Sequence, residues 1–166
     1  MVNKARLKTY ALQGLLFIGL LYAVHLYKTR NHTGETAPMV LGHLLDGGSA
    51  QLGGQHEGPV LLHFWATWCG VCSLEEGSIE ALSRDVRVIS VASRSGSDQD
   101  VRKHMRSRGL TFPVINDPSG AIARAYGVRE YPSSFFVTRQ GSVATSEVGY
   151  TTSLGLRLRL WYAGFW

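Results

Sequence analysis

The sequence predicts a three-layer α/β/α domain with a mixed sheet, preceded by one N-terminal transmembrane helix. Apolar runs alternate with amphipathic segments over residues 60–126, two further apolar runs follow at 134–148, and residues 10–27 are almost wholly apolar. Strands separated by helices run parallel, whereas strands joined by a short turn pair antiparallel, so the sheet should be mixed. The 166 residues, less an anchor, leave room for one domain with a sizeable core.

Periodicity and turn residues place the individual elements. Strands are expected at 60–65, 86–91, 112–115, 134–138 and 142–148, and helices at 70–84, 99–108, 121–126 and 153–161. Ser97 and Gly109 suit the two ends of the second helix. The turn signal at 46–49 predicts a small hairpin ahead of the core. In the last helix, Leu154, Leu158 and Trp161 fall roughly on one face.

The apolar stretch 10–27 spans roughly 27 Å as a helix, just enough to cross the hydrocarbon core of a bilayer. No small-x-small cleavage site follows it, which favours an uncleaved anchor over a removed signal peptide. The chain then divides into a cytoplasmic basic segment at 1–9, the anchor at 10–27, a tether at 28–37 and a domain at 38–166. The balance of basic residues mildly favours a cytoplasmic N-terminus, which puts the domain outside the cytoplasm.

The excess of positive over negative charge is confined to the N-terminal part of the chain. The net charge is +5, and five basic residues account for it: Lys4, Arg6, Lys8, Lys28 and Arg30. From Asn31 onward, twelve Lys and Arg balance twelve Asp and Glu. The domain therefore lacks the basic footprint of a nucleic-acid-binding protein, and no nucleic-acid partner is expected.

The only two cysteines, Cys69 and Cys72, stand between the predicted strand 60–65 and the predicted helix that follows. Cys69 should lie at the helix N-terminus, where unpaired amides and the helix dipole favour a thiolate. This arrangement indicates a redox dithiol. A plain structural disulfide over so short a loop would add only about 2 kcal/mol, and two cysteines alone cannot close a four-ligand metal site. We therefore expect no metal and no cofactor beyond the Cys69–Cys72 disulfide.

Three segments carry a resemblance to a known family. The stretch 64–72, Phe-Trp-Ala-Thr-Trp-Cys-Gly-Val-Cys, resembles the active site of the thioredoxin superfamily. The segments 110–118 and 126–128 resemble its membrane-tethered, extracytoplasmic TlpA/DsbE-like branch. The likeness covers roughly residues 38–162. It implies a thioredoxin-like fold, protein disulfides as clients and a transmembrane electron donor. It also implies a periplasmic domain on the bacterial inner membrane.

The resemblance also suggests roles for individual residues. Cys69, nearer solvent, would attack a client disulfide, and Cys72 would resolve the mixed disulfide. Base rates favour a trans peptide bond before Pro132, but in the family this proline is cis and faces the dithiol. Pro132 would then leave the backbone of Tyr131 free to pair with an extended substrate, with Tyr131 lining the groove and Trp68 forming its apolar rim.

His63 stands where thioredoxins carry a buried aspartate behind the second cysteine. A neutral imidazole could accept the proton of Cys72, but His63 could equally be a core histidine bonded to the backbone, and the sequence leaves both open. Glu75 and Glu76 are expected on a solvated helix face. Val71 replaces the proline that thioredoxins usually carry, which leaves the reduction potential open.

The sequence thus predicts a protein-disulfide reductase, a thiol:disulfide interchange protein. The tail 155–161 and the Gly70–Val71 pair resemble one branch member, which implies a link to copper or redox stress. A reductant for cytochrome c maturation has the same chemistry with another client. A Cu(I)-binding module would use the dithiol as soft ligands. A peroxidase would need a threonine-rich loop before its cysteine, and Trp68 stands there instead.

Overall fold

The computed structural model describes residues 10, 13–20, 23 and 35–165. It separates into two compact units, 1–31 and 32–166. In the first unit, residues 13–20 are helical. Among the described residues, no helix is both long enough and apolar enough to traverse a bilayer. The described residues do not include the predicted basic segment, much of the predicted anchor or most of the tether. The anchor therefore stays a prediction.

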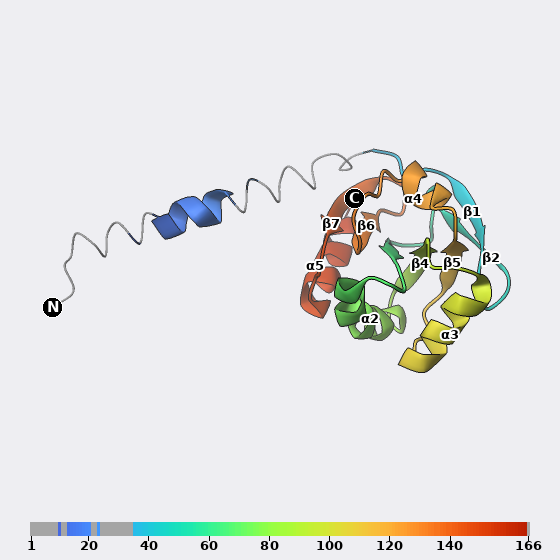
Figure 1. The fold of residues 1–166 in the computed structure, drawn as a ribbon. Coiled ribbons are helices and arrows are strands. Elements are labelled where there is room, and N and C mark those ends of the chain that lie inside the picture. The colour runs from blue at the N-terminus through green and yellow to red at the C-terminus, as the bar shows by residue number, and fades with distance from the viewer. Residues whose placement is uncertain (1–9, 11–12, 21–22, 24–34, 166) are drawn as a thin grey trace. The chain divides into compact units, whose positions relative to one another are not determined.

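The second unit contains two sheets and four helices (Figure 1). Its elements in chain order are β1 (Val40–His43), β2 (Ser49–Leu52), β3 (Val60–Trp65), α2 (Gly70–Ser83), β4 (Arg87–Ser93), α3 (Asp98–Arg108), β5 (Val114–Asp117), α4 (Ala121–Ala125), β6 (Ser133–Val137), β7 (Val143–Val148) and α5 (Ser153–Ala163). The main sheet has the order β5-β4-β3-β6-β7. β3, β4 and β5 run parallel, whereas β6 and β7 add antiparallel. The mixed sheet is confirmed.

The central strand β3 separates two apolar layers, and all six of its residues are buried. Leu61 and Trp65 pack with apolar side chains of α2, α3 and α5 on one face. Leu62 and Phe64 pack on the other face with residues of α4 and of the small hairpin β1–β2. Because successive strand residues point to opposite faces, a continuous apolar run is what a strand buried on both sides requires. The predicted three-layer arrangement follows.

Among the strands, β4 and β5 depart furthest from the bounds expected from the sequence. β5 begins at Val114 rather than at Phe112, because Pro113 has no N–H for a ladder, although its carbonyl accepts from the Ser90 amide at 3.0 Å. β4 continues to Ser93, which pairs with Asp117. The ends of α3 agree with expectation, since Ser97 forms a capping box and Gly109 adopts a left-handed conformation.

The glutamates of α2 correct the expectation of a solvated face, because Glu75, Glu76 and Glu80 are all buried. Glu76 accepts from His104 Nε2 at 2.7 Å and from Arg108 Nε at 2.8 Å, and so joins α2 to α3. Glu80 accepts from the backbone amides of Thr111 and Phe112 and from the Thr111 hydroxyl, and so fixes the approach to β5. Both carboxylates have structural partners.

Replacing Glu80 by Ala should destabilise the domain by about 2 kcal/mol, because it leaves the buried amide of Phe112 and the part-buried amide of Thr111 without an acceptor. Urea unfolding monitored by circular dichroism would measure the loss. Glu57→Ala is the matched control, because Glu57 is exposed. An equal loss in the two variants would show that the Glu80 carboxylate does not hold this loop.

Candidate active site

The two cysteines lie where β3 gives way to α2. Cys69 is the N-cap residue of α2, and its Sγ accepts a hydrogen bond from the Cys72 amide at 3.2 Å. A disulfide joins the two cysteines, whose Cα atoms are 5.3 Å apart. Cys69 is 7% exposed and Cys72 only 1%. A thiolate on Cys69 would therefore meet a free helix N-terminus and an amide donor, while Cys72 is shielded behind it.

The loop before β6 faces the dithiol. The Tyr131–Pro132 peptide bond is cis, and the Tyr131 carbonyl oxygen lies 3.7 Å from Cys69 Sγ. Long-range folding brings this loop to Cys69, because β6 pairs with β3 and sets Ser133 opposite Phe64. The structure thus brings together the two segments that the sequence singled out.

Trp68 is 62% exposed beside the dithiol. Its ring meets Tyr131 edge to face at a centroid distance of 5.7 Å, and its indole N–H donates to the Arg94 carbonyl at 2.9 Å. Val71 and Leu74, on the exposed side of the first turns of α2, extend this surface. The rim around the disulfide is therefore apolar and suits contact with a protein rather than with a small charged molecule.

His63 lies on the central strand and is buried. Its Nδ1 is 3.0 Å from the Ser134 hydroxyl on β6, so its partner is a side chain rather than the backbone. Burial lowers the pKa of His63 to about 3. A neutral imidazole with so low a pKa holds a proton poorly near neutral pH. The proposed role of His63 in proton handling stays a prediction.

Glu75 is a candidate that the sequence reasoning missed. It lies one turn of α2 beyond Cys72 and is fully buried, and neither of its carboxylate oxygens has a hydrogen-bond partner among the described residues. Burial raises the pKa of Glu75 from 4.5 to about 7. The backbone amide of Thr151 lies near the carboxylate and opposes the shift, but it does not reach hydrogen-bond geometry, and the charge of Glu147 adds to the shift. The signal in the sequence was its position three residues after Cys72.

Polar residues continue across the sheet beneath α2. His63, Ser134 and Glu147 are consecutive partners across β3, β6 and β7, and Glu147 forms an ion pair with Arg159 of α5. Each of these groups has an ion-pair or hydrogen-bond partner. Glu75 differs from them, because its buried carboxyl has a pKa suited to exchanging a proton near neutral pH. Within the described residues, no three His, Cys, Asp or Glu side chains cluster as a metal site would require.

Comparison with known proteins places this site in a family. Residues 33–146 match the AhpC/TSA family, and the chain belongs to that family. A thioredoxin-like protein of Haemophilus influenzae is 34% identical over 108 residues, which is 64% of each chain. The thiol-disulfide oxidoreductase ResA of Geobacillus thermodenitrificans is 29% identical over 80% of this chain and 79% of its own.

A solved structure agrees with these relatives. The thiol:disulfide interchange protein DsbE of Chlorobium tepidum superposes with a TM-score of 0.67 and 26% identity, over 79% of this chain and 96% of that one. The fold, the dithiol at a helix start and these relatives define the class of the chain, a thioredoxin-like thiol–disulfide oxidoreductase.

Glu75→Gln should stabilise the oxidised protein by about 2 kcal/mol at pH 8 and change little near pH 4. The folded-state pKa of Glu75 is raised, so the wild type loses stability as the pH rises from about 4.5 to about 7. Gln, which stays neutral, removes that loss. Urea unfolding at the two pH values measures it, and an equal effect at both would show that Glu75 does not titrate in the folded protein.

Proposed function

We propose that the chain reduces disulfides in client proteins outside the cytoplasmic membrane, through its Cys69–Cys72 dithiol. The observation that carries this proposal is the position of Cys69 at the start of α2, against the carbonyl of Tyr131. An extended client could pair with the backbone at Tyr131–Pro132 and rest on the apolar rim of Trp68, which would bring its disulfide to Cys69.

In the proposed reaction, the Cys69 thiolate attacks one sulfur of the client disulfide, and the other client sulfur leaves as a thiolate that takes up a proton. Cys72 loses its proton and attacks Cys69, which releases the second client thiol and forms the Cys69–Cys72 disulfide. Two electrons pass from the enzyme to the client. A transmembrane protein dithiol would supply the two electrons that restore the reduced enzyme.

Cys72 must lose its proton in a site with almost no solvent. We propose Glu75 as the group that takes this proton, because it is buried one turn away and lacks a competing hydrogen-bond partner among the described residues. For His63, the sequence left this step and a structural role in the core equally open. With a pKa near 3, His63 would need a large rearrangement of its surroundings to act as a base.

For its location, we propose a single-pass anchor at 10–27 in the bacterial inner membrane, with the domain in the periplasm. The apolar stretch, the basic residues before it and the lack of a cleavage motif support this topology. Within the branch, we propose that the chain resembles the suppressor-of-copper-sensitivity protein ScsD. The segments that support this resemblance are the tail 155–161 and the Gly70–Val71 pair. That likeness would connect the enzyme with copper or redox stress.

A reductant that serves cytochrome c maturation is a second candidate, supported by the similarity to the protein named DsbE. It would use the same dithiol, and its client would be the haem-binding cysteines of an apocytochrome. The two candidates differ only in client, and fold alone does not decide between clients.

Cys72→Ser should trap the client on Cys69 as a stable mixed disulfide, because the resolving thiol is gone. We expect mass spectrometry of the tethered protein from non-reducing gels to identify the client or the electron donor. Cys69→Ser, which keeps only the shielded thiol, is the matched control. Absence of any Cys69 adduct would contradict the reductase, whereas a trapped apocytochrome would favour the second candidate.

A reduction potential near −270 mV would assign the reducing direction, and one near −120 mV the oxidising direction.

Glu75→Gln should slow client reduction by about 100-fold at neutral pH and remove a titration near pH 7 from the pH–rate profile. His63→Ala should leave the position of that titration unchanged, since His63 does not charge in this range. Stopped-flow reduction of a protein disulfide between pH 5 and pH 9 would measure both variants. A titration that persists in Glu75→Gln and moves in His63→Ala would reassign the proton to His63.

A further inference from the structure

Helix α5 is apolar on two opposite sides. Leu156, Leu160 and Ala163 are buried against the core. Leu154, Leu158, Trp161 and Phe165 form a second line, which we call the outer stripe, and they are 55–70% exposed. At about 100° per residue the outer stripe occupies an arc of roughly 60°, opposite the buried residues. The face expected from the sequence exists, but it points away from the core.

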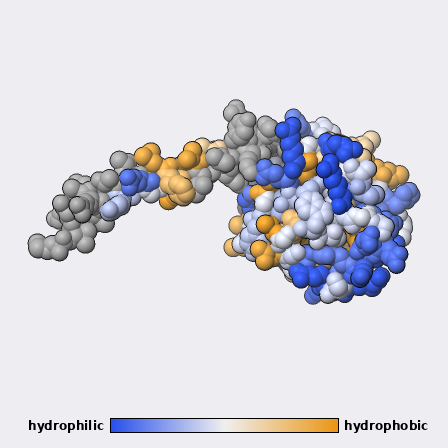
Figure 2. Space-filling view, in the orientation of Figure 1, coloured by the Kyte–Doolittle hydropathy of each residue, from blue (hydrophilic) through white to orange (hydrophobic). Residues whose placement is uncertain are grey.

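The outer stripe is large, uncharged and rich in aromatic residues. Trp161 and Phe165 pack edge to face, with centroids 4.5 Å apart, and Figure 2 shows hydrophobic side chains along the edge of the domain that α5 occupies in Figure 1. Helix α5 contains no acidic residue. Its two arginines lie on the flanks, where Arg157 pairs with Asp85 and Arg159 with Glu147. A helix with two apolar sides needs something to cover the outer one.

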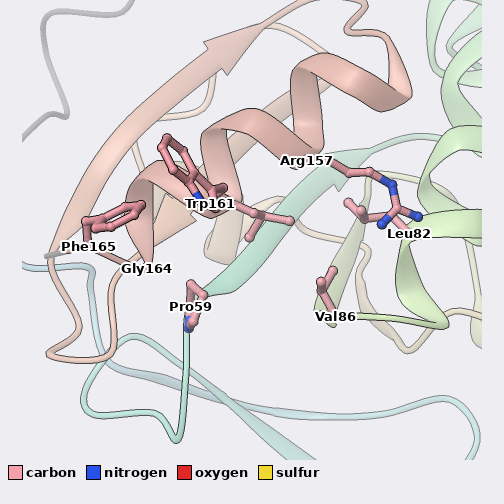
Figure 3. Close-up of a pocket in the computed structure, with 8 residues that line it drawn as sticks. Pro59, Leu82, Val86, Arg157, Trp161, Gly164 and Phe165 are labelled. Atoms are coloured by element: carbon pink, nitrogen blue, oxygen red, sulfur yellow. The ribbon is translucent and has the colours of Figure 1, made fainter.

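A pocket extends this apolar surface inward. It has a volume of about 420 Å³ and lies between the C-terminal part of α5, the start of β3 and the segment before β4. Figure 3 shows Trp161 and Phe165 extending from the C-terminal part of α5, with Pro59 and Val86 below them in the view. Arg157 contributes the only charge of the lining, and that charge is paired with Asp85.

The position of this surface within the domain indicates its occupant. The dithiol lies at the end of the sheet where Phe64 pairs with Ser133, and the β6–β7 turn lies at the opposite end, where Val60 pairs with Val137. The chain enters the domain at that turn, because the Ala37 amide donates to Gly141 and the Val143 amide to Glu35. The last residues of α5 reach Pro59, at the same end. The aromatic part of the outer stripe therefore lies where the tether joins the domain.

We infer that the outer stripe of α5 docks the domain on the lipid surface of the membrane, with the dithiol turned away from it. The inference rests on the proposed anchor, since the ten residues of the tether 28–37 reach at most roughly 35 Å. Exposed Trp, Phe and Leu side chains on one side of a helix suit the interface between headgroups and acyl chains. Because both arginines are internally paired, apolar area rather than charge drives the docking, and salt should weaken it little.

The test uses the full chain in vesicles of phosphatidylethanolamine and phosphatidylglycerol. Trp161→benzoylphenylalanine places a photo-crosslinker on the outer stripe. Leu74→benzoylphenylalanine, at the dithiol end and equally exposed, is the matched control. After illumination, mass spectrometry should find lipid adducts at position 161 and essentially none at position 74. Adding Leu158→Asp should lower the lipid adduct at 161 about tenfold, while reduction of a soluble protein disulfide stays unchanged.

Equal lipid adducts at positions 161 and 74, or none at 161, would overturn the inference. A covalent dimer through position 161 would also overturn it and assign the stripe to a second copy of the chain. Alkaline carbonate extraction of the same vesicles tests the anchor separately. A chain that resists extraction but gives no lipid adduct at 161 refutes the docking and keeps the anchor. A chain that is extracted yet gives the adduct refutes the anchor and keeps the docking.

Discussion

The site depends on the burial of β3 between two layers. All six residues of this strand are buried, so its register and direction are fixed by both halves of the core. Its pairing with β4 and β6 sets the point where the chain leaves the sheet and begins α2. The same pairing with β6 brings Tyr131 to within 3.7 Å of Cys69. Strand β3 thus leads into the turn that holds Cys69 and, through its pairing with β6, positions the loop that faces it.

The three buried glutamates of α2, Glu75, Glu76 and Glu80, have different roles that their surroundings determine. Glu76 and Glu80 are buried because neighbouring elements supply enough donors to compensate for the loss of water. Glu75 is buried without such donors among the described residues, and so its proton-bound form becomes stable near neutral pH. A carboxyl that contributes little to the fold but changes charge in the working range, next to a redox thiol, has the features of a functional group. The environment assigns the role, and the residue type does not.

Local patterns predicted much of the fold. Three features could be predicted because each depends on residues that are close together in the sequence. They are the buried strand β3, the caps of α3 and the turn before β7. The dithiol could be predicted for the same reason, since its two cysteines are three residues apart. The raised pKa of Glu75 could not be predicted in this way, because it depends on burial in the folded domain and on Thr151 and Glu147, more than seventy residues away along the chain. The sequence also did not indicate which side of α5 faces the core, since both sides of that helix carry leucines and only packing in the fold selects Leu156 and Leu160.

The two ends of the domain carry different chemistry, and the antiparallel turn between β6 and β7 explains why. That turn sends the chain back to the dithiol end before α5 begins, since Val148 lies opposite Ser133. Helix α5 then runs toward the end where residues 35–37 join the domain, and its aromatic residues come last. An enzyme that meets folded or extended clients needs its reactive cysteine clear of any surface to which it is attached. In the membrane-anchored enzyme that we propose, the sheet would meet that requirement through topology, because the dithiol and residues 35–37 lie at opposite ends of its strands.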